Sequence, residues 1–229
     1  MILLNNRYNL YKKFRKTCLS CGSAQLKNIF DLGLHSFADR FIKKKDLKLK
    51  DPVYPLVIDL CIKCSFIQSK YITNPKDRYL NYEYSYTSSN SIYSKSHWES
   101  YAVYLNKNFD LKGKKILEIG SNDGILSDFL KKYGADVFCV DASPEMIQIT
   151  KRKGLKSIRT IFNKKNSKFI KAKTKKVDII IANNVFNHSD DPSDFLSGVH
   201  SLLKNKGLFI FEQPYFLSTL VTKKFDQIY

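Results

Sequence analysis

Apolar and polar residues alternate along the second half of the chain in runs that predict strands separated by helices. Short continuous apolar runs are typical of strands buried inside a sheet. The predicted strands are 116–119, 136–140, 157–162, 177–182 and 208–212. Helices are predicted at 91–108, at 144–153 and from Asp191 to about Lys204. Because strands that alternate with helices form parallel sheets covered on both faces, we expect an α/β fold with its ligands at the carboxyl ends of the strands.

The first of these strands ends in an acid and a turn rich in glycine, Glu118-Ile119-Gly120-Ser121-Asn122-Asp123-Gly124. Glycine lets the backbone pass close to a ligand, and the helix that follows offers free N–H groups at the same place. This arrangement favours a nucleoside-type cofactor. The spacing is E-x-G-x-x-x-G, so the central glycine of the dinucleotide fingerprint is absent and Asn122 stands there instead.

The next strand ends in Asp141, about twenty residues beyond the first glycine, which is the interval at which such folds place an acid that binds ribose. A carboxylate there can accept both ribose hydroxyls. The alternative role is a helix N-cap, because Ser143-Pro144-Glu145 follows and proline favours the first helical turn. The two roles are compatible, and together the turn and the acid favour a nucleoside cofactor.

Polar side chains also follow the strands at 177–182 and 208–212. Asn183 and Asn184 come directly after the first, and the same loop contains His188. A histidine at this edge can act as a general base near neutral pH, but His188 can equally begin an exposed loop. Glu212 is either a base or a strand-end cap, and the sequence does not separate these roles. His188 is the one histidine that we expect at this edge, since His97 falls on the helix at 91–108.

Four of the five cysteines form two C-x-x-C pairs, Cys18-x-x-Cys21 and Cys61-x-x-Cys64, separated by 39 residues. Four thiolates in this arrangement predict a tetrahedral structural zinc site, because four protein ligands leave no open position for catalysis. Two disulfides or two redox pairs are the alternatives. The segment between the pairs leaves room for a small β-rich insert around 53–60. The fifth cysteine, Cys139, lies inside a predicted strand, where we expect a small buried side chain.

Composition narrows the class of protein. The chain has 229 residues, a formal net charge of +18 and 43% hydrophobic residues. Only six of the 39 basic residues are arginine, and the lysines are scattered, which argues against a nucleic-acid substrate. A groove for an anionic nucleotide-sugar is equally compatible with the charge. No apolar run approaches the roughly 20 residues of a membrane span, and the start lacks a signal-peptide core, so we expect a soluble, cytoplasmic protein.

The segment before the glycine turn is crowded with tyrosine. Tyr84, Tyr86 and the polar run Thr87–Ser91 do not fit a helix and predict a loop that carries hydroxyl groups. The expected organisation is an N-terminal extension, a zinc-binding domain, a tyrosine-rich connecting segment with its helix, and a cofactor-binding domain. Their expected bounds are 1–16, 17–75, 76–110 and 111–229.

In this order the motifs resemble those of the zinc-containing sugar C-methyltransferases, which act on nucleotide-linked deoxysugars. The resemblance rests on the two cysteine pairs, the Tyr84-x-Tyr86-x-Ser88-Ser89-x-Ser91 loop, the glycine turn, Asn183-Asn184-Val185-Phe186-x-His188 and Phe225-Asp226-x-Ile228-Tyr229. It implies a class I methyltransferase fold, that is, a Rossmann-like parallel sheet with helices on both faces, preceded by a small zinc-binding β-rich domain. It also implies C-methylation beside a keto group: a base removes the acidic proton, and the enolate attacks the methyl group of S-adenosylmethionine.

The resemblance further implies roles for individual residues and two cofactors, S-adenosylmethionine and Zn²⁺. The implied partner is a small-molecule substrate, a nucleotide-linked sugar. Residues that line the substrate pocket or act in catalysis would be Tyr84, Tyr86, His188 and Tyr229. Residues that bind the cofactor would be Glu118, Gly120, Asn122, Asp123, Gly124, Asp141 and Asn183. The metal ligands would be Cys18, Cys21, Cys61 and Cys64.

One departure from the family bears on activity. In the family the Phe-Asp-x-Ile-Tyr segment continues into a His-Glu-His run that supplies the base, whereas this sequence stops at Tyr229. We therefore expect a shortened chain that binds cofactor but catalyses weakly. Two alternatives stay open: a methyltransferase for RNA or for a small oxygen or nitrogen nucleophile, and a fragment that holds zinc and cofactor without catalysis.

Overall fold

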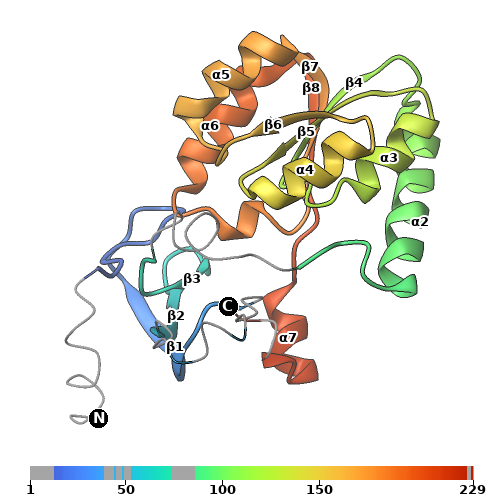
Figure 1. Ribbon diagram of the computed structural model, residues 1–229. Coiled ribbons are helices and arrows are strands. Elements are labelled where there is room, and N and C mark those ends of the chain that lie inside the picture. The colour runs from blue at the N-terminus through green and yellow to red at the C-terminus, as the bar shows by residue number, and fades with distance from the viewer. Residues whose placement is uncertain are drawn as a thin grey trace. The chain divides into compact units, whose positions relative to one another are not determined.

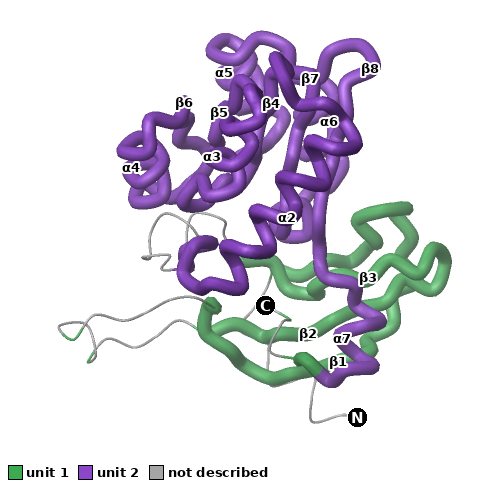
Figure 2. The backbone as a smooth tube through the Cα atoms, turned by 90° about the vertical axis from the view of Figure 1, so that its right-hand side faces the viewer, with its two compact units in different colours: residues 1–85, 224–229 green, residues 86–223 purple. Residues whose placement is uncertain are grey.

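The computed structural model describes residues 13–38, 44, 48, 53–73, 86–225 and 228. The chain divides into two compact units, shown in different colours in Figure 2. The first unit comprises residues 1–85 and 224–229, and the second comprises residues 86–223. Each unit is described below by itself.

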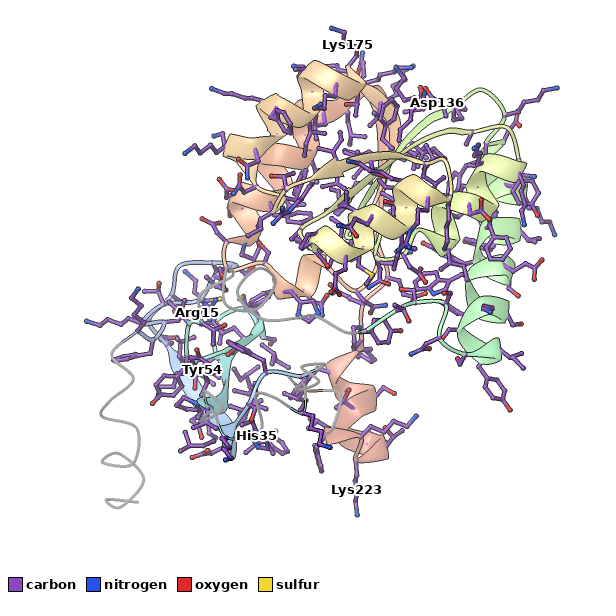
Figure 3. The ribbon with its side chains drawn as sticks, in the orientation of Figure 1. Arg15, His35, Tyr54, Asp136, Lys175 and Lys223 are labelled. Atoms are coloured by element: carbon purple, nitrogen blue, oxygen red, sulfur yellow. The ribbon has the colours of Figure 1, made fainter. Side chains whose placement is uncertain are left out.

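The first unit contains a three-stranded antiparallel sheet in the order β1-β2-β3. Its strands are β1 (Leu26–His35), β2 (Tyr54–Cys61) and β3 (Ile67–Ser69). Leu26 pairs with Cys61 at one end of the β1–β2 ladder, and His35 pairs with Tyr54 at the other end, where both side chains are labelled in Figure 3. The ladder thus starts at a cysteine of the second C-x-x-C pair. The β-rich character expected around 53–60 is confirmed.

The second unit contains a five-stranded sheet in the order β6-β5-β4-β7-β8, in which every described pairing is parallel. The strands are β4 (Lys115–Ile119), β5 (Asp136–Asp141), β6 (Lys156–Arg159), β7 (Val177–Ile181) and β8 (Leu203–Ile210). The helices are α2 (Ile92–Phe109), α3 (Ile125–Lys132), α4 (Pro144–Arg152), α5 (Lys164–Thr174), η3 (Phe186–His188), α6 (Pro192–Leu202) and α7 (Phe216–Thr222). The strand order reverses direction at β4, and such a point is where open α/β sheets bind ligands.

Helices cover both faces of this sheet, as Figure 1 shows. Successive residues of a strand point to opposite faces, so Ile116 and Leu117, both fully buried, belong to different cores. One core joins β4 and β7 to α2 and α3, and it includes Ala102, Leu105, Leu126 and Leu130. The other core joins the opposite face to α5 and α6, and it includes Ile170, Phe195, Val199 and Leu202. The predicted α/β fold with helices on both faces is confirmed.

Local sequence signals fix several helix starts. Ser91 caps α2 by accepting a hydrogen bond from the N–H of Ser94, and Ser143 caps α4 in the same way. Asp191 caps α6, whose first residue is Pro192. In each case the side-chain oxygen satisfies an N–H that lacks a partner within its own helix. These caps position the loops that lead out of the sheet.

Two strands differ from the pattern-based expectation. β6 ends at Arg159, earlier than the apolar run to residue 162 suggested, and β8 begins at Leu203, earlier than residue 208. The pairing of β8 with β7 shifts register between Val177–Leu203 and Ile179–Leu208, so the polar residues between belong to an irregular part of the strand. Because these residues are polar, the hydrophobic pattern did not predict the first half of β8. No helix in the described part of the chain is long and apolar enough to cross a membrane.

Candidate active site and metal centre

The four cysteines of the first unit converge on one point. Their Sγ atoms all lie within 4.8 Å of one another. The Cys18–Cys64 and Cys21–Cys61 sulfur pairs are each 3.6 Å apart. Four thiolates around one zinc ion at a Zn–S distance of about 2.3 Å stand about 3.8 Å apart in a tetrahedron. All four are free cysteines, so the disulfide alternative does not hold. The cluster has the donor set and the spacing of a structural zinc site.

The two C-x-x-C pairs fold into equivalent turns. In the first turn the N–H of Gly22 donates to the carbonyl of Cys18 (2.9 Å), and in the second the N–H of Ser65 donates to the carbonyl of Cys61 (2.8 Å). Both donors have a positive φ, 72° for Gly22 and 61° for Ser65. The N–H of Ser20 also donates to Cys18 Sγ at 3.4 Å. Such turns aim backbone dipoles at sulfur and favour the thiolate form.

The thiol of Cys61 shows this effect. Desolvation raises its pKa, but hydrogen bonds from the backbone N–H groups of Cys64 and Lys63 and from the thiols of the cluster lower the pKa to about 7. The pKa of Cys64 moves the other way: a hydrogen bond from the backbone of Phe66 lowers it, but desolvation and the hydrogen bonds with the other three thiols raise it to about 12. A thiol must lose its proton to bind a metal ion, so Cys61 is ready to bind one near neutral pH, whereas the ion must displace the proton of Cys64.

Gln68, a residue that sequence analysis did not single out, fastens the first cysteine turn to β3. Its Oε1 accepts a hydrogen bond from the N–H of Leu19 (2.9 Å), and its Nε2 donates to the carbonyl of Thr17 (3.1 Å). The side chain is buried. These two bonds flank Cys18 and hold it in position. No local pattern identifies such a residue, because its partners lie far away in the sequence.

In the second unit the glycine turn follows β4 directly. Gly120 has φ +68°, and a Cβ atom added there would stand 2.2 Å from Cγ2 of Val185. Gly124 has φ +76°, and its Cβ would stand 2.7 Å from Leu155 and 2.9 Å from Thr150. L-residues rarely adopt these torsions. Both positions therefore require glycine for two independent reasons, conformation and space.

Asp141, at the end of β5, is hydrogen-bonded to the glycine turn. Its Oδ2 accepts the N–H of Asn122 (2.9 Å), and its Oδ1 accepts the N–H of Ser143 (2.8 Å). Burial raises the pKa of this carboxyl. The N-cap of α4 is Ser143 rather than Asp141. The alternative role considered for Asp141 thus belongs to its neighbour, and each Asp141 oxygen keeps a lone pair for a further donor.

Glu118 lies near the end of β4, two residues before Gly120. It is buried, and Ser127 Oγ donates to its carboxyl while Cys139 Sγ donates in turn to Ser127 Oγ at 3.2 Å. Burial raises the pKa of Glu118 to about 8 and that of Cys139 to about 12. Cys139 is fully buried, as the sequence predicted. Glu118 is therefore bonded to α3, the helix that begins directly after the glycine turn.

Asn122 and Asp123 join the glycine turn to the loop that contains Tyr86. Asn122 Oδ1 accepts the N–H of Ser88 (2.8 Å), and Asn122 Nδ2 donates to the carbonyl of Tyr86 (3.0 Å). Asp123 Oδ2 accepts the N–H of Ser89 (3.0 Å). The structure thus brings Tyr86 beside the predicted cofactor turn. The other two predicted tyrosines, Tyr84 and Tyr229, lie outside the described residues.

The carboxyl ends of β7 and β8 form the other half of the edge. Asn183 Oδ1 accepts the N–H of Glu212 (2.9 Å) and the hydroxyl of Tyr101 (3.4 Å). Since the N–H of Glu212 can only donate, the amide oxygen of Asn183 must face it. Burial raises the pKa of Tyr101 to about 12. His188 ends η3 in the loop after β7, where its N–H donates to the carbonyl of Val185 (3.0 Å). Asp136 and Lys175 mark the opposite, amino edge of the sheet (Figure 3).

His97 also reaches this edge, which corrects the expectation that His188 would be the one histidine there. Its Nε2 lies 3.2 Å from Glu212 Oε2. Helix α2 packs against α3 and the sheet, and this packing carries His97 to the end of β8. The sequence contains no local signal for this pairing, because the two residues lie on elements that are far apart along the chain.

Comparison with known proteins agrees with this architecture. A family model described as "Methyltransferase domain" matches residues 97–229, more than half of the chain. The chain belongs to this methyltransferase family. A second model, described as "Putative zinc binding domain", matches residues 18–79, which include all four clustered cysteines.

Among curated proteins, the C-methyltransferase NovU of Streptomyces niveus is 23% identical over 213 residues, which cover 93% of this chain and 50% of that protein. A ubiquinone biosynthesis O-methyltransferase of Xanthomonas oryzae pv. oryzae is 28% identical over 119 residues, covering 51% of this chain and 47% of that protein. The chain thus spans about half the length of the curated relatives it matches.

Among solved structures, the PH0226 protein from Pyrococcus horikoshii OT3 matches with a TM-score of 0.50 and 24% identity. The match covers 61% of this chain and 67% of that chain. This likeness concerns the fold.

Proposed function

We propose that this methyltransferase transfers a methyl group from S-adenosylmethionine to a carbon beside the keto group of a nucleotide-linked deoxysugar. The observation that carries the proposal is the extent of the similarity to the C-methyltransferase NovU, which spans 93% of the chain and so includes the cysteine unit. The similarity to the ubiquinone O-methyltransferases is confined to about half of the chain. The zinc unit therefore favours the C-methyltransferase as the functional relative.

The residues at the carboxyl edge fit the cofactor. Gly120 opens the backbone beside Val185, and Asp141 retains lone pairs that can accept ribose hydroxyls. Two buried polar atoms at this edge, Ser121 Oγ and Asn183 Nδ2, have no hydrogen-bond partner among the described residues. Buried polar groups are normally bonded, so such atoms favour a ligand that completes them. When bound, S-adenosylmethionine would supply an electrophilic methyl group on its sulfonium.

In this proposal Gly120, Asn122, Gly124 and Asp141 hold the cofactor, with Asp123 and Asn183 beside it and Glu118 supporting the turn from below. Tyr86 faces substrate from the loop that Asn122 fixes. His188, on the loop after β7, is a candidate base. By resemblance to the family, Tyr84 and Tyr229 would line the substrate pocket with it. The work of these residues is to orient the acidic C–H bond toward the methyl group and to accept its proton.

We also propose that the four clustered cysteines bind one structural zinc ion. A closed shell of four thiolates leaves no position for substrate, so the ion stabilises the first unit. Metal analysis of protein purified without chelators should give about one zinc per chain. Replacement of Cys61 by serine should lower that content and unfold the cysteine turns, whereas replacement of the buried Cys139 by serine should leave the zinc content unchanged. Zinc below a third of this value would contradict the assignment.

Methyl transfer can be tested with the purified chain. Calorimetry should detect binding of S-adenosylmethionine and S-adenosylhomocysteine. Incubation with labelled cofactor and either a keto-deoxysugar nucleotide or a phenolic acceptor then separates the two chemistries, because NMR distinguishes a C–CH₃ from an O–CH₃ product. We expect the C-methylated sugar. An O-methylated phenol alone would transfer the assignment to the second candidate, a small oxygen nucleophile, which the likeness to the ubiquinone O-methyltransferases supports. Failure to bind either S-adenosylmethionine or S-adenosylhomocysteine would refute both candidate functions.

A further inference from the structure

The loop at 86–90, the Tyr86 loop, is fastened to two neighbouring residues of the glycine turn. Asn122 Oδ1 accepts the N–H of Ser88 (2.8 Å), and Asn122 Nδ2 donates to the carbonyl of Tyr86 (3.0 Å). Asp123 Oδ2 accepts the N–H of Ser89 (3.0 Å). We propose that the side chain of Asn122 is a positioning residue for the methyl acceptor, acting through this loop rather than on the cofactor. The inference rests on the proposed function, because it concerns the acceptor of that same reaction.

The side chain of Asn122 is committed to these bonds. Its Oδ1 accepts a second hydrogen bond from the N–H of Asp123 (2.8 Å), so both lone pairs of the amide oxygen are used. Because backbone N–H groups can only donate, the amide oxygen must face them, and Nδ2 must face the Tyr86 carbonyl. Asn122 is 9% exposed. Little of this side chain remains available to a ligand.

Asp123 is bonded in a similar way. Its Oδ1 accepts the N–H of Ile125 (3.3 Å), its Oδ2 accepts that of Ser89, and the residue is 2% exposed. Its carbonyl accepts a hydrogen bond from Lys153 Nζ (2.7 Å). The turn is therefore held by several elements at the point where the Tyr86 loop is attached, and a loop bonded to such residues is held in place with the turn.

The backbone of Asn122, unlike its side chain, belongs to the proposed cofactor site. Its N–H donates to Asp141 Oδ2 (2.9 Å), and Asp141 is the proposed acceptor of the ribose hydroxyls. Asn122 has φ 50°, a left-handed conformation that glycine adopts readily. A glycine here, as in the dinucleotide fingerprint, would supply the same N–H. The asparagine side chain thus adds the attachment of the loop and is not needed for the bond to Asp141.

The Tyr86 loop presents an accessible aromatic residue beside this turn. Ser88 is buried, whereas Tyr86 is 36% exposed. Directly after the loop, Ser91 Oγ accepts the N–H of Ser94 and caps α2. The loop is thus fixed on one side by the glycine turn and on the other by the helix. A contact residue that is held in advance binds its ligand more tightly, because less conformational freedom is lost on binding.

The variant Asn122→Gly separates the two roles. It tolerates the backbone conformation and keeps the N–H for Asp141, but it removes both bonds to the loop. In NMR hydrogen-exchange measurements the Ser88 amide, which donates to Asn122 Oδ1, should exchange about tenfold faster than in wild type. Calorimetry should give an S-adenosylhomocysteine affinity within about twofold of wild type.

Binding of the acceptor is measured on the chain loaded with S-adenosylhomocysteine, with thymidine diphosphate-4-keto-6-deoxyglucose as the probe. Its dissociation constant should be about tenfold higher for Asn122→Gly, since the released loop must be ordered on binding. Asn90→Ala, at an exposed residue of the same loop, is the matched control and should bind the probe with wild-type affinity. Asn122→Asp keeps an acceptor for Ser88 but loses the donor to Tyr86, so its affinity should lie between those of Asn122→Gly and wild type.

Several outcomes would overturn the inference. Equal probe affinity of Asn122→Gly and wild type would show that the side chain does not act on the acceptor, and unchanged exchange of the Ser88 amide would show that it does not hold the loop. A larger loss of S-adenosylhomocysteine affinity than of probe affinity would assign the side chain to the cofactor. If Asn122→Gly does not fold, the comparison of Asn122→Asp with wild type decides by the same criteria.

Failure of the proposed function would look different. Loaded wild type that does not bind the probe would refute the sugar nucleotide as acceptor, and the inference would fall with it. Wild type that binds the probe as tightly as Asn122→Gly does would refute the inference alone and leave the proposed function standing.

Discussion

The two halves of the carboxyl edge are built in opposite ways. Beside β4 and β5 the glycine turn is buried and bonded internally: the N–H groups of Gly120 and Ser121 both donate to the carbonyl of Val140, at 2.7 and 3.1 Å. Beside β7 and β8 the side chains are accessible, with Asn184 exposed and His97 and Glu212 about half exposed. The first half is held by internal hydrogen bonds without any ligand, whereas the polar side chains of the second half remain accessible to solvent.

This difference matches the tasks proposed for the two halves. A site for one fixed cofactor gains affinity when its backbone is held in the binding geometry in advance, because less freedom is lost on binding. A site for the acceptor must admit a substrate and release a bulkier product, so accessible polar groups suit it. We therefore expect single added atoms in the glycine turn to destabilise the fold, whereas substitutions in the β7–β8 half should have little effect on stability.

The largest effect is expected at Gly120. Gly120 has φ +68°, and a Cβ atom added there would stand 2.2 Å from Val185 Cγ2. Strain of about 1–2 kcal/mol for the left-handed torsion and about 1–3 kcal/mol for overpacking should lower the free energy of unfolding in Gly120→Ala by about 2–5 kcal/mol. Urea denaturation measures this change.

The double variant Gly120→Ala/Val185→Ala separates the two causes. It should recover the overpacking part of the loss and retain the torsional part, which appears as a coupling energy in a double-mutant cycle. Purely additive losses would show that Val185 does not constrain the turn.

Asp141→Ala should have the next largest effect. It removes the carboxylate that bonds the turn and is proposed to accept ribose hydroxyls, so the affinity for S-adenosylmethionine should fall by about 1.5–3 kcal/mol. The matched control is Asp136→Asn at the opposite end of the same strand, where the side chain pairs with Lys156 on the surface. Calorimetry should give the control wild-type affinity. Equal affinity of Asp141→Ala and wild type would remove Asp141 from the site.

Sequence patterns could predict the first half of the edge because its determinants are local. The glycines sit where one strand passes into one helix, and Asp141 ends the next strand, so spacing alone places them together once the sheet is parallel. The cysteine pairs are local in the same sense: each turn brings two thiols together within four residues. The fold class followed from the alternation of strands and helices.

The second half could not be predicted, because its partners meet only through packing. His97 reaches Glu212 because α2 packs on the sheet, and nothing near either residue in the sequence indicates the other. Gln68 beside Cys18 is a second such case. The side chain of Asn122 is a third: the sequence placed it in the glycine turn, but its bonds to the loop of Tyr86 depend on the folded structure.

Glu118 should make stability depend on pH. Burial raises its pKa from 4.5 to about 8, so the folded state keeps the carboxyl neutral where the unfolded chain has lost the proton. The folded state then binds more protons between these values, and this group's contribution to stability, fully present below pH 4.5, falls as pH rises to about 8. The expected loss is on the order of 1 kcal/mol per pH unit.

The matched variant Glu118→Gln keeps the shape and removes the titration. Relative to wild type, it should gain about 2 kcal/mol of stability between pH 6 and 8, a range chosen to keep the cysteine thiols able to bind metal. Denaturation curves at several pH values measure this gain. Parallel pH profiles of the two proteins would show that Glu118 is ionised in the folded state.

The smallest effect is expected at Asn184, which makes it the counterpart of Gly120 on the open half. Asn184 also has a positive φ, 53°, but it is exposed, and asparagine tolerates this conformation. Asn184→Gly relieves slight strain and loses one long hydrogen bond to Glu212, so stability should change by less than about 0.5 kcal/mol. Cofactor affinity should stay at the wild-type value. A loss comparable to that of Gly120→Ala would show that the β7–β8 half is as tightly constrained as the glycine turn, and the distinction between the two halves would fail.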